Sequence, residues 1–190
     1  YILNIETATD ICSVAISNDT DICAVAEITG NEHTAQLTIL IEKCLKEAGI
    51  KLSDLAAVAV SNGPGSYTSL RVGVSTAKGI CYAMELPLLA IDTLEILAHA
   101  AYTAAPDPEA LYCPMIDARR MEVYCALYQF DNRKTVCLQP MQAEIIDEHS
   151  FKTYFDDGQK IVFVGNGAPK TQPILTSPLA HYQAVLCSAA

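Results

Sequence analysis

Along the first 91 residues, apolar patterns typical of strands change to patterns typical of helices and back. This order constrains the fold more than any other feature of the sequence. Short apolar runs bounded by polar turns predict strands, at residues 1–5, 12–17, 22–28, 57–60 and 88–91. Apolar residues at helical spacing predict two long helices, from about residue 32 to 48 and from about residue 67 to 84. The order β-β-β-α-β-α-β indicates an α/β fold with a mixed sheet.

The rest of the chain contains a second unit that also begins with a strand. The segment Ala-Ala-Pro-Asp-Pro at 104–108 is the best candidate for a linker. We therefore expect a first subdomain at residues 1–104 and a second at residues 105–190. Further strands are predicted at 112–116, 123–130, 135–138 and 160–164, and further helices at 94–101 and 145–155.

The composition is that of a globular protein with a sizeable core. Of the 190 residues, 51% are hydrophobic and 18% are charged. The formal net charge of −10 would repel a phosphate backbone, so a partner should supply the basic surface if nucleic acid is bound. No apolar run reaches the roughly 18 residues of a membrane span, and no basic leader precedes Tyr1–Ile5. We expect a soluble, cytoplasmic protein without a membrane contact.

The eight cysteines do not form any C-x-x-C pair, and most of them lie in apolar runs. A secreted disulfide scaffold would be shorter and richer in loops. We expect reduced, mostly buried thiols in a cytosolic protein. The cysteines are Cys12, Cys23, Cys44, Cys81, Cys113, Cys125, Cys137 and Cys187.

A glycine-rich loop at Gly63-Pro64-Gly65-Ser66 joins a predicted strand to the second long helix. Exposed amides at a helix N-terminus can hold phosphate. The loop matches neither a P-loop nor the G-x-G-x-x-G dinucleotide fingerprint. Alternatively, the glycines only form the turn, and Ser66 or Thr68 caps the helix.

A compact charged group, Asp117, Arg119 and Glu122, follows the strand predicted at 112–116. These side chains either line a cleft that contacts a partner or nucleotide, or form a local salt bridge that fixes the turn. Two interpretations are also open for Gly165-Asn166-Gly167. The glycines either approach an adenine closely or form a plain turn.

Four segments in order resemble the TsaB (YeaZ) family. Asn62–Gly73, with its Gly-Pro-Gly-Ser-Tyr-Thr core, is similar to the family's GRGPGSFTGVRIG. Ile5–Thr9 resembles I-D-T-A/S-T, and Ile116–Tyr124 resembles I-D-A-R-x-x-E-V-Y. His33, ahead of Leu37, resembles the start of the H-S/T-x-x-L-L/I helix. The resemblance covers about residues 2–130 and then weakens.

The resemblance implies an ASKHA fold (actin, sugar kinase, Hsp70) with two mixed-sheet α/β subdomains. It also implies a scaffold or activator role beside TsaD, the catalytic paralogue, and TsaE, an ATPase. That complex transfers a threonylcarbamoyl group from its adenylate to the adenosine beside the anticodon of tRNAs that read ANN codons. The chain would contact tRNA only through the complex and would pair with itself when the paralogue is absent.

The metal pair of the catalytic paralogue is the feature that this chain lacks. The two histidines of its H-x-x-x-H correspond to about Thr93 and Leu97, and neither residue can bind a metal. We therefore expect no catalytic residues and no metal in this chain. The alternatives are a metallo-glycoprotease, which needs a metal site, and a small-molecule kinase of the same superfamily, which needs tight ATP binding.

The turn Glu6-Thr7-Ala8-Thr9 lies where ASKHA proteins bind phosphate. Members that hydrolyse ATP usually have an Asp and a glycine there, and this chain has Glu6 and no glycine. The turn is either a weak nucleotide site or a polar turn bonded to nearby amides. We expect no tightly bound cofactor, although a nucleotide at the junction with the catalytic partner remains an option. The candidate cleft residues are Glu6, Thr7, Thr9, Gly63, Gly65, Ser66, Asp117, Arg119 and Glu122.

The second long helix has a stripe of small residues beside an apolar stripe, which suits close packing against another helix. In the family, this helical face serves both self-pairing and pairing with the paralogue. The predicted interface residues are His33, Leu37, Ser69, Gly73, Thr76, Gly79 and Ala83. The stripe predicted to face the core is Leu70, Val74, Ala77, Cys81 and Met84. The family's C-terminal portion runs some tens of residues past Ala190, so we expect the second subdomain to be truncated or diverged.

Overall fold

The computed structural model divides the chain into two compact units. It describes residues 1–19, 21–30, 33–131, 134–185 and 187–190, and the side chains of residues 33–35 lie outside this description. Unit 1 comprises Tyr1–Thr93 together with Cys187–Ala190, and unit 2 comprises Leu94–Leu186. The predicted boundary after residue 104 is therefore wrong: the helix at the boundary packs with the second unit, and the chain returns to the first unit at its end.

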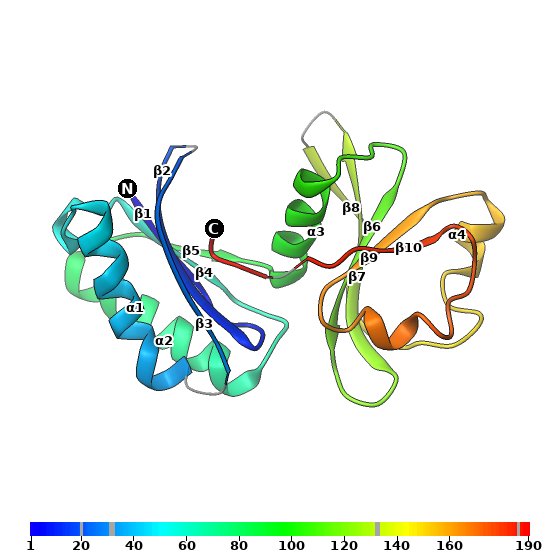
Figure 1. Cartoon of the computed structure of the whole chain (residues 1–190), viewed down its shortest axis with the longest axis horizontal. Helices are drawn as coiled ribbons and strands as arrows, with labels where there is room; N and C mark the ends of the chain where they lie inside the picture. Colours follow the sequence, from blue (N-terminus) through cyan, green and yellow to red (C-terminus); the bar gives the residue numbers. More distant parts are fainter. Residues whose placement is uncertain (20, 31–32, 132–133, 186) are drawn as a thin grey trace. The chain divides into compact units, whose positions relative to one another are not determined.

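Unit 1 is built on a five-stranded mixed sheet in the order β3-β2-β1-β4-β5 (Figure 1). β1 pairs antiparallel with β2 and parallel with β4, so the meander and the parallel part of the sheet meet at β1. The strands are β1 (Ile2–Glu6), β2 (Ile11–Asn18), β3 (Asp21–Thr29), β4 (Ala57–Ser61) and β5 (Leu88–Ile91). Connecting elements are α1 (His33–Ala48), the 3-10 turn η1 (Leu52–Asp54) and α2 (Tyr67–Met84).

Both long helices lie on the same face of the first sheet (Figure 1). Side chains alternate between the two faces of a strand, and in β1 Leu3 and Ile5 point into the core below the helices. The helices contribute Leu37, Ile41 and Cys44 from α1, and Ala77 and Cys81 from α2. α2 ends at Met84 because Glu85 adopts a left-handed conformation (φ 55°) and returns its N–H to the Cys81 carbonyl.

Unit 2 repeats the topology of unit 1 in its own five-stranded sheet, ordered β10-β9-β6-β7-β8. β6 pairs antiparallel with β7 and parallel with β9, as β1 does with β2 and β4. The strands are β6 (Leu111–Asp117), β7 (Glu122–Asp131), β8 (Lys134–Ile145), β9 (Ile161–Val164) and β10 (Ala180–Tyr182). The helical elements are α3 (Thr93–Ala104), α4 (Lys152–Asp156) and the 3-10 turn η2 (Pro169–Thr171).

The second sheet has a separate core on each face. On the α3 side, Tyr102 stacks on Phe130 with ring centroids 4.3 Å apart, and Tyr112 meets Phe130 edge-on. On the other face, Cys113, Met115 and residues of β7 and β9 pack against Phe151. The two mixed α/β sheets confirm the predicted fold class.

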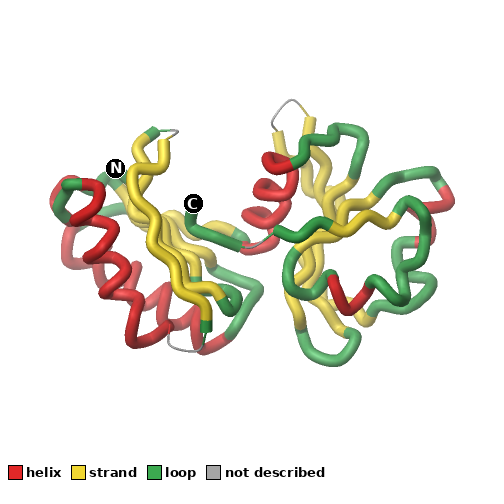
Figure 2. The backbone as a smooth tube through the Cα atoms, in the orientation of Figure 1, coloured by secondary structure: helices red, strands yellow, loops and turns green. Residues whose placement is uncertain are grey.

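Most predicted elements are found, and the largest error concerns residues 145–155. The structure continues β8 to Ile145 and forms a helix only at Lys152–Asp156 (Figure 2). The twelve-residue strand pairs with β7 along its length, which carries it past the predicted end at residue 138. Between this strand and the helix, Asp147 Oδ1 accepts the N–H groups of His149 and Ser150, so a turn forms in place of the predicted helix. All eight cysteines lie among the described residues and none is in a disulfide; six are buried as predicted, while Cys23 and Cys137 are exposed on β3 and β8. Among the helices that the structure describes, none combines the length and the apolar character that crossing a membrane would require.

Candidate functional site

The predicted cleft residues occupy two topologically equivalent corners, one in each unit. In parallel sheets, ligands bind at the carboxyl ends of the strands where the strand order reverses. Corner 1 comprises the turn after β1, beginning at Glu6, and the Gly63–Ser66 loop after β4. Corner 2 comprises the turn after β6, beginning at Asp117, and the Gly165–Gly167 loop after β9. Each corner therefore places an acidic residue beside a glycine-containing loop.

The acidic residue of corner 1 is buried. Glu6 is 1% exposed, and its Oε1 accepts a hydrogen bond from the Ala8 N–H at 2.5 Å. The Ser61 hydroxyl and the Cys187 thiol approach the carboxyl, yet Oε2 makes no hydrogen bond of normal geometry. Burial raises the pKa of Glu6, and the hydrogen bonds from its neighbours offset this rise only in part. The surroundings of Glu6 therefore disfavour the charged carboxylate that cation binding requires.

The glycine loop of corner 1 lies directly against the turn after β1. The Ser66 N–H donates to the Ala8 carbonyl at 2.7 Å. A Cβ at Gly65 would lie 2.8 Å from the Ala8 Cα, closer than real side chains approach. Ser66 is the N-cap residue of α2, but its side chain caps no helix amide and instead meets the Ser69 hydroxyl at 3.0 Å. The glycine is thus required for the contact between loop and turn, whereas the expected capping by Ser66 is not found.

Thr7 and Thr9 have different surroundings in the same turn. Thr7 is fully buried against Gly73 of α2, and its hydroxyl has no hydrogen-bond partner. Thr9 is half-buried and accepts a 3.4 Å hydrogen bond from the Ile11 N–H, as expected for a polar turn.

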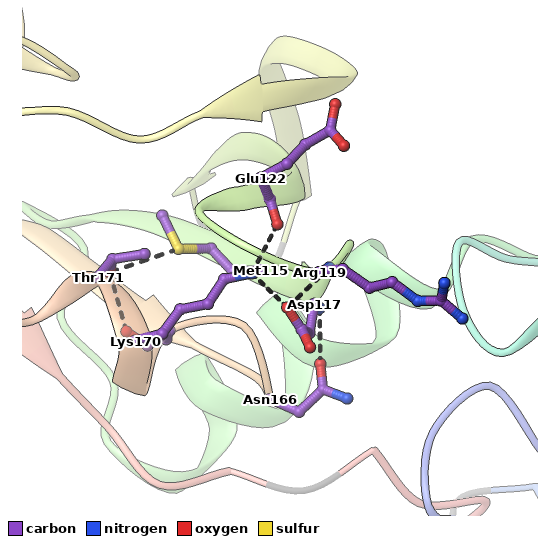
Figure 3. Close-up of polar contacts among 8 residues, drawn as sticks. Met115, Asp117, Arg119, Glu122, Asn166, Lys170 and Thr171 are labelled. Carbon is purple, nitrogen blue, oxygen red and sulfur yellow. Dashed lines mark hydrogen bonds and ion pairs between the residues drawn. The ribbon is translucent and has the colours of Figure 1, made fainter.

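The acidic residue of corner 2 is exposed and paired (Figure 3). Lys170 of η2 donates to the Asp117 carboxylate and, at 2.7 Å, to the Glu122 carbonyl. The Lys170 ammonium group is the main reason why the pKa of Asp117 lies below its usual value. Asp117 is therefore ionised at neutral pH, and the two corners shift the pKa values of their acidic residues in opposite directions.

The turn of corner 2 is held from the loop after β9. The Asn166 Oδ1 accepts the Asp117 N–H at 3.0 Å, and the Arg119 N–H donates to Asp117 Oδ1 at 3.1 Å. The guanidinium of Arg119 and the carboxylate of Glu122 both point away from this cluster in Figure 3. The salt bridge that fixes the turn is thus made by Lys170 and not by Arg119.

Lys170 and Asn166 were missed as partners of Asp117 in the sequence, because they lie about fifty residues away. The repeated strand order supplies the signal that would have found them. It places the loop after the strand at 160–164 beside the turn after the strand at 112–116.

We expect Lys170→Met to loosen corner 2 in a pH-dependent way. The pair's contribution is fully present above the usual Asp pKa of about 3.9. It is lost as the pH falls through the lowered pKa of Asp117. Because the pair is partly exposed, the loss of unfolding free energy at pH 7 should be about 1 kcal/mol. Thermal melting between pH 7 and pH 3 measures this, with Lys152→Met as a matched lysine control. A loss that is unchanged at pH 3 would contradict the assignment.

The predicted partner interface on α1 and α2 is only partly accessible. Gly73 is buried, and a Cβ there would meet Thr7. Leu37 is 1% exposed and belongs to the core. Both assignments are wrong, because the deepest line of α2 runs through Gly73, Ala77 and Cys81 at four-residue spacing. The side chain of His33, the first residue of α1, lies outside the described residues.

The outward face of α2 retains the rest of the predicted stripe. Gly79 has open space around it, Ala83 is exposed, and Ser69 and Thr76 are half-buried. Tyr82 is 90% exposed beside them. A shallow open hollow of about 460 Å³ is lined by Thr68, Arg71, Val72, Ser75 and Thr76. Of the predicted interface, a partner can reach Ser69, Thr76, Gly79 and Ala83. Together with Tyr82, which was not predicted, these residues form the accessible α2 face.

The positions that correspond to the metal ligands of the catalytic paralogue are buried. Thr93 begins α3, and Leu97 is 1% exposed in the core of unit 2. In the part of the chain that the structure describes, no three His, Cys, Asp or Glu side chains are grouped as metal ligands.

Comparison with known proteins gives one consistent result. The family model of TsaD, tRNA N6-adenosine threonylcarbamoyltransferase, matches residues 24–174. The tRNA threonylcarbamoyladenosine biosynthesis protein TsaB of Escherichia coli is 39% identical over 130 residues, which are 68% of this chain and 55% of that protein. The structure of YeaZ from Pseudomonas aeruginosa superposes with a TM-score of 0.84 at 26% identity, over 99% of this chain and 86% of that one. The chain belongs to the TsaB (YeaZ) family.

The chain matches only part of the length of its curated relatives. This TsaB-family chain spans about half the length of the curated relatives it matches, 55% of the Escherichia coli protein and 61% of a Buchnera aphidicola TsaB. The ethanolamine utilization protein EutJ from Carboxydothermus hydrogenoformans, at 10% identity and a TM-score of 0.56, shares the fold alone. Together with YeaZ, it places the chain in the ASKHA superfamily.

Proposed function

We propose that this chain is a non-catalytic subunit of the machinery that forms threonylcarbamoyladenosine on tRNA. In this proposal it pairs with a TsaD-type catalytic paralogue, works with a TsaE-type ATPase, and forms a homodimer when the paralogue is absent. The observation that carries the proposal is the 39% identity to a TsaB over 68% of the chain.

The accessible α2 face is the surface through which we propose pairing. Small residues such as Gly79 and Ala83 let two helix backbones approach closely. Tyr82, almost fully exposed beside them, is the kind of aromatic side chain that gains most from burial at an interface. α1 lies alongside α2 on the same face of the sheet, so a partner would meet two neighbouring helices of the same unit (Figure 1).

Two features support a non-catalytic role. Thr93 and Leu97 replace the metal-binding histidines of the paralogue and are both buried. In corner 1, burial disfavours the charged form of Glu6, whereas metal binding requires the charged carboxylate. With a net charge of −10, the chain alone would bind tRNA weakly, so the complex would supply the tRNA contact.

Reconstitution tests the proposal. The chain, cognate TsaD-type and TsaE-type proteins, threonylcarbamoyl adenylate and an unmodified tRNA that reads ANN codons are combined, and the modified adenosine is measured by mass spectrometry. We expect no product from the chain alone and at least a tenfold rise when the chain is added to the other two proteins.

Either of two results would overturn the proposal. One is EDTA-sensitive turnover by the isolated chain, which would indicate a metalloenzyme. The other is a complete reaction whose rate does not change when the chain is left out. Sub-micromolar tRNA binding by the chain alone at about 0.15 M salt would contradict the assignment of the tRNA contact to the complex.

A further inference from the structure

Residues 187–190, here called the strap, pack against unit 1 after the chain has passed through unit 2. The Ala189 N–H donates to the Ser13 hydroxyl of β2 at 2.7 Å. Cys187 is 2% exposed and approaches the Glu6 carboxyl. In β1 and β2, Glu6 and Ser13 are register partners, so both point to the face of the sheet opposite α1 and α2. The strap thus covers the helix-free face of corner 1 (Figure 2).

The seat of the strap contains polar groups whose hydrogen-bonding capacity is not used. Glu6 Oε2 and Ser61 Oγ are both buried without a hydrogen bond of normal geometry. Ser61 is the last residue of β4 and is next in register after the pair Ile5–Val60, so it lies beside Glu6. A buried polar group without a partner costs free energy that water would restore. Binding of the strap to unit 1 therefore costs free energy, and this free energy is regained when the strap leaves.

Corner 2 shows what corner 1 lacks. There, Lys170 supplies a cation to the acidic residue, and Asp117 remains exposed to water. In corner 1, the strap brings the Cys187 thiol to Glu6, while its Ala189 N–H donates to Ser13. The same corner of the fold thus carries a stable ion pair in unit 2 and an unpaired buried acid in unit 1.

We infer that the strap is a detachable latch, seated on Glu6 and Ser13, that can leave unit 1 without unfolding it. The chain passes between the two units at residues 93–94 and again at residues 186–187. The strap directly follows the second connection. The Glu6 carboxyl sets the equilibrium between the seated and the released strap, because hydration of this carboxyl favours release.

The pH dependence follows from the groups that face Glu6. The titratable ones are Cys12 of β2 and Cys187 of the strap; Ser61 and the Thr7–Ala8 turn are uncharged. Burial raises the pKa of Cys12 to about 11 and that of Cys187 further, so both thiols stay neutral at neutral pH. The pKa of Glu6 is raised while the strap is seated. Seating is therefore strongest below the usual Glu pKa of about 4.3 and weakens as the pH rises through the raised value.

Thiol labelling of the native chain tests this latch. N-ethylmaleimide is applied between pH 5.5 and 8, and each cysteine is followed by peptide mass spectrometry. Exposed Cys23 is the reference for thiol chemistry, and buried Cys44 reports unfolding. We expect the ratio of Cys187 to Cys23 labelling to rise with pH, by up to roughly tenfold per unit, while Cys44 stays protected.

Two matched pairs of proteins complete the test. Glu6→Gln keeps the shape and stays neutral, so its ratio of Cys187 to Cys23 labelling should be independent of pH and at least several-fold lower than that of wild type at pH 8. Ala189→Pro removes the N–H that binds Ser13 and should label several-fold faster at every pH, whereas Ala189→Gly should not. Equal pH profiles for wild type and Glu6→Gln, Cys187 labelling as fast as Cys23 throughout, or Cys44 labelling together with Cys187 would each overturn the inference.

Discussion

Gly73→Ala is expected to destabilise the chain although it adds a better helix former. A Cβ at Gly73 would lie 3.2 Å from Thr7 Cγ2 and still closer to Thr7 Oγ1, and Thr7 is fully buried. Overpacking of this kind costs about 1–3 kcal/mol, against the roughly 1 kcal/mol that alanine gains over glycine inside a helix. We expect a net loss of about 1–2 kcal/mol in unfolding free energy, measured by urea or thermal denaturation.

Gly79 provides the matched control in the same helix. Nothing lies within 4 Å of a Cβ built there, so Gly79→Ala should raise stability by up to about 1 kcal/mol. The clash at Gly73 can also be tested directly, because Thr7→Ala removes both contacting atoms. In the double variant Thr7→Ala/Gly73→Ala the loss should be smaller than the sum of the single losses. Equal effects of alanine at positions 73 and 79 would refute the packing described here.

Gly79→Leu is expected to abolish pairing with a TsaD-type partner while leaving the chain folded. If a partner helix crosses the accessible α2 face at Gly79, a leucine there would push the two helices apart and expose apolar surface. We expect affinity to fall at least a hundredfold, about 2.7 kcal/mol, in sedimentation or calorimetry with the purified partner. The melting temperature of the chain alone should not fall, because a Cβ at position 79 has nothing within 4 Å and the position faces outward.

Gly79→Ala is the conservative control for pairing, since a methyl group fits a close helix crossing better than an isobutyl group. A Gly79→Leu chain that still pairs with full affinity would move the interface away from this part of α2. An early-melting Gly79→Leu chain would instead show that the position is not free in the monomer. Sedimentation and melting of the same sample separate these outcomes.

Local patterns in the sequence determined the elements of unit 1. Apolar alternation and helical spacing placed α1 and α2 within one residue of their observed bounds. The ordered family motifs then gave the ASKHA fold, since four matches in sequence order constrain the fold more than any single motif. Residues 145–155 were misjudged because whether β8 continues depends on pairing with β7, which lies elsewhere in the sequence.

The faces of α2 show where sequence reasoning reached its limit. Periodicity gave two adjacent stripes, apolar and small, but it could not fix the rotation of the helix on the sheet. A small residue such as Gly73 serves equally well at a partner interface and at a close internal contact. Only the position of Thr7 below α2 decides that Gly73 faces inward and Gly79 outward.

By itself, the sequence determined the α/β class, the family and the residues of the two corners, because these follow from local periodicity and short motifs. The tertiary structure decided the state of each corner. The pKa of Asp117 is lowered because Lys170, distant in the sequence, reaches it from η2, and the pKa of Glu6 is raised because folding removes its carboxyl from water. Charge state depends on solvation and on partners brought together by folding, and neither is written in the spacing of residues along the chain.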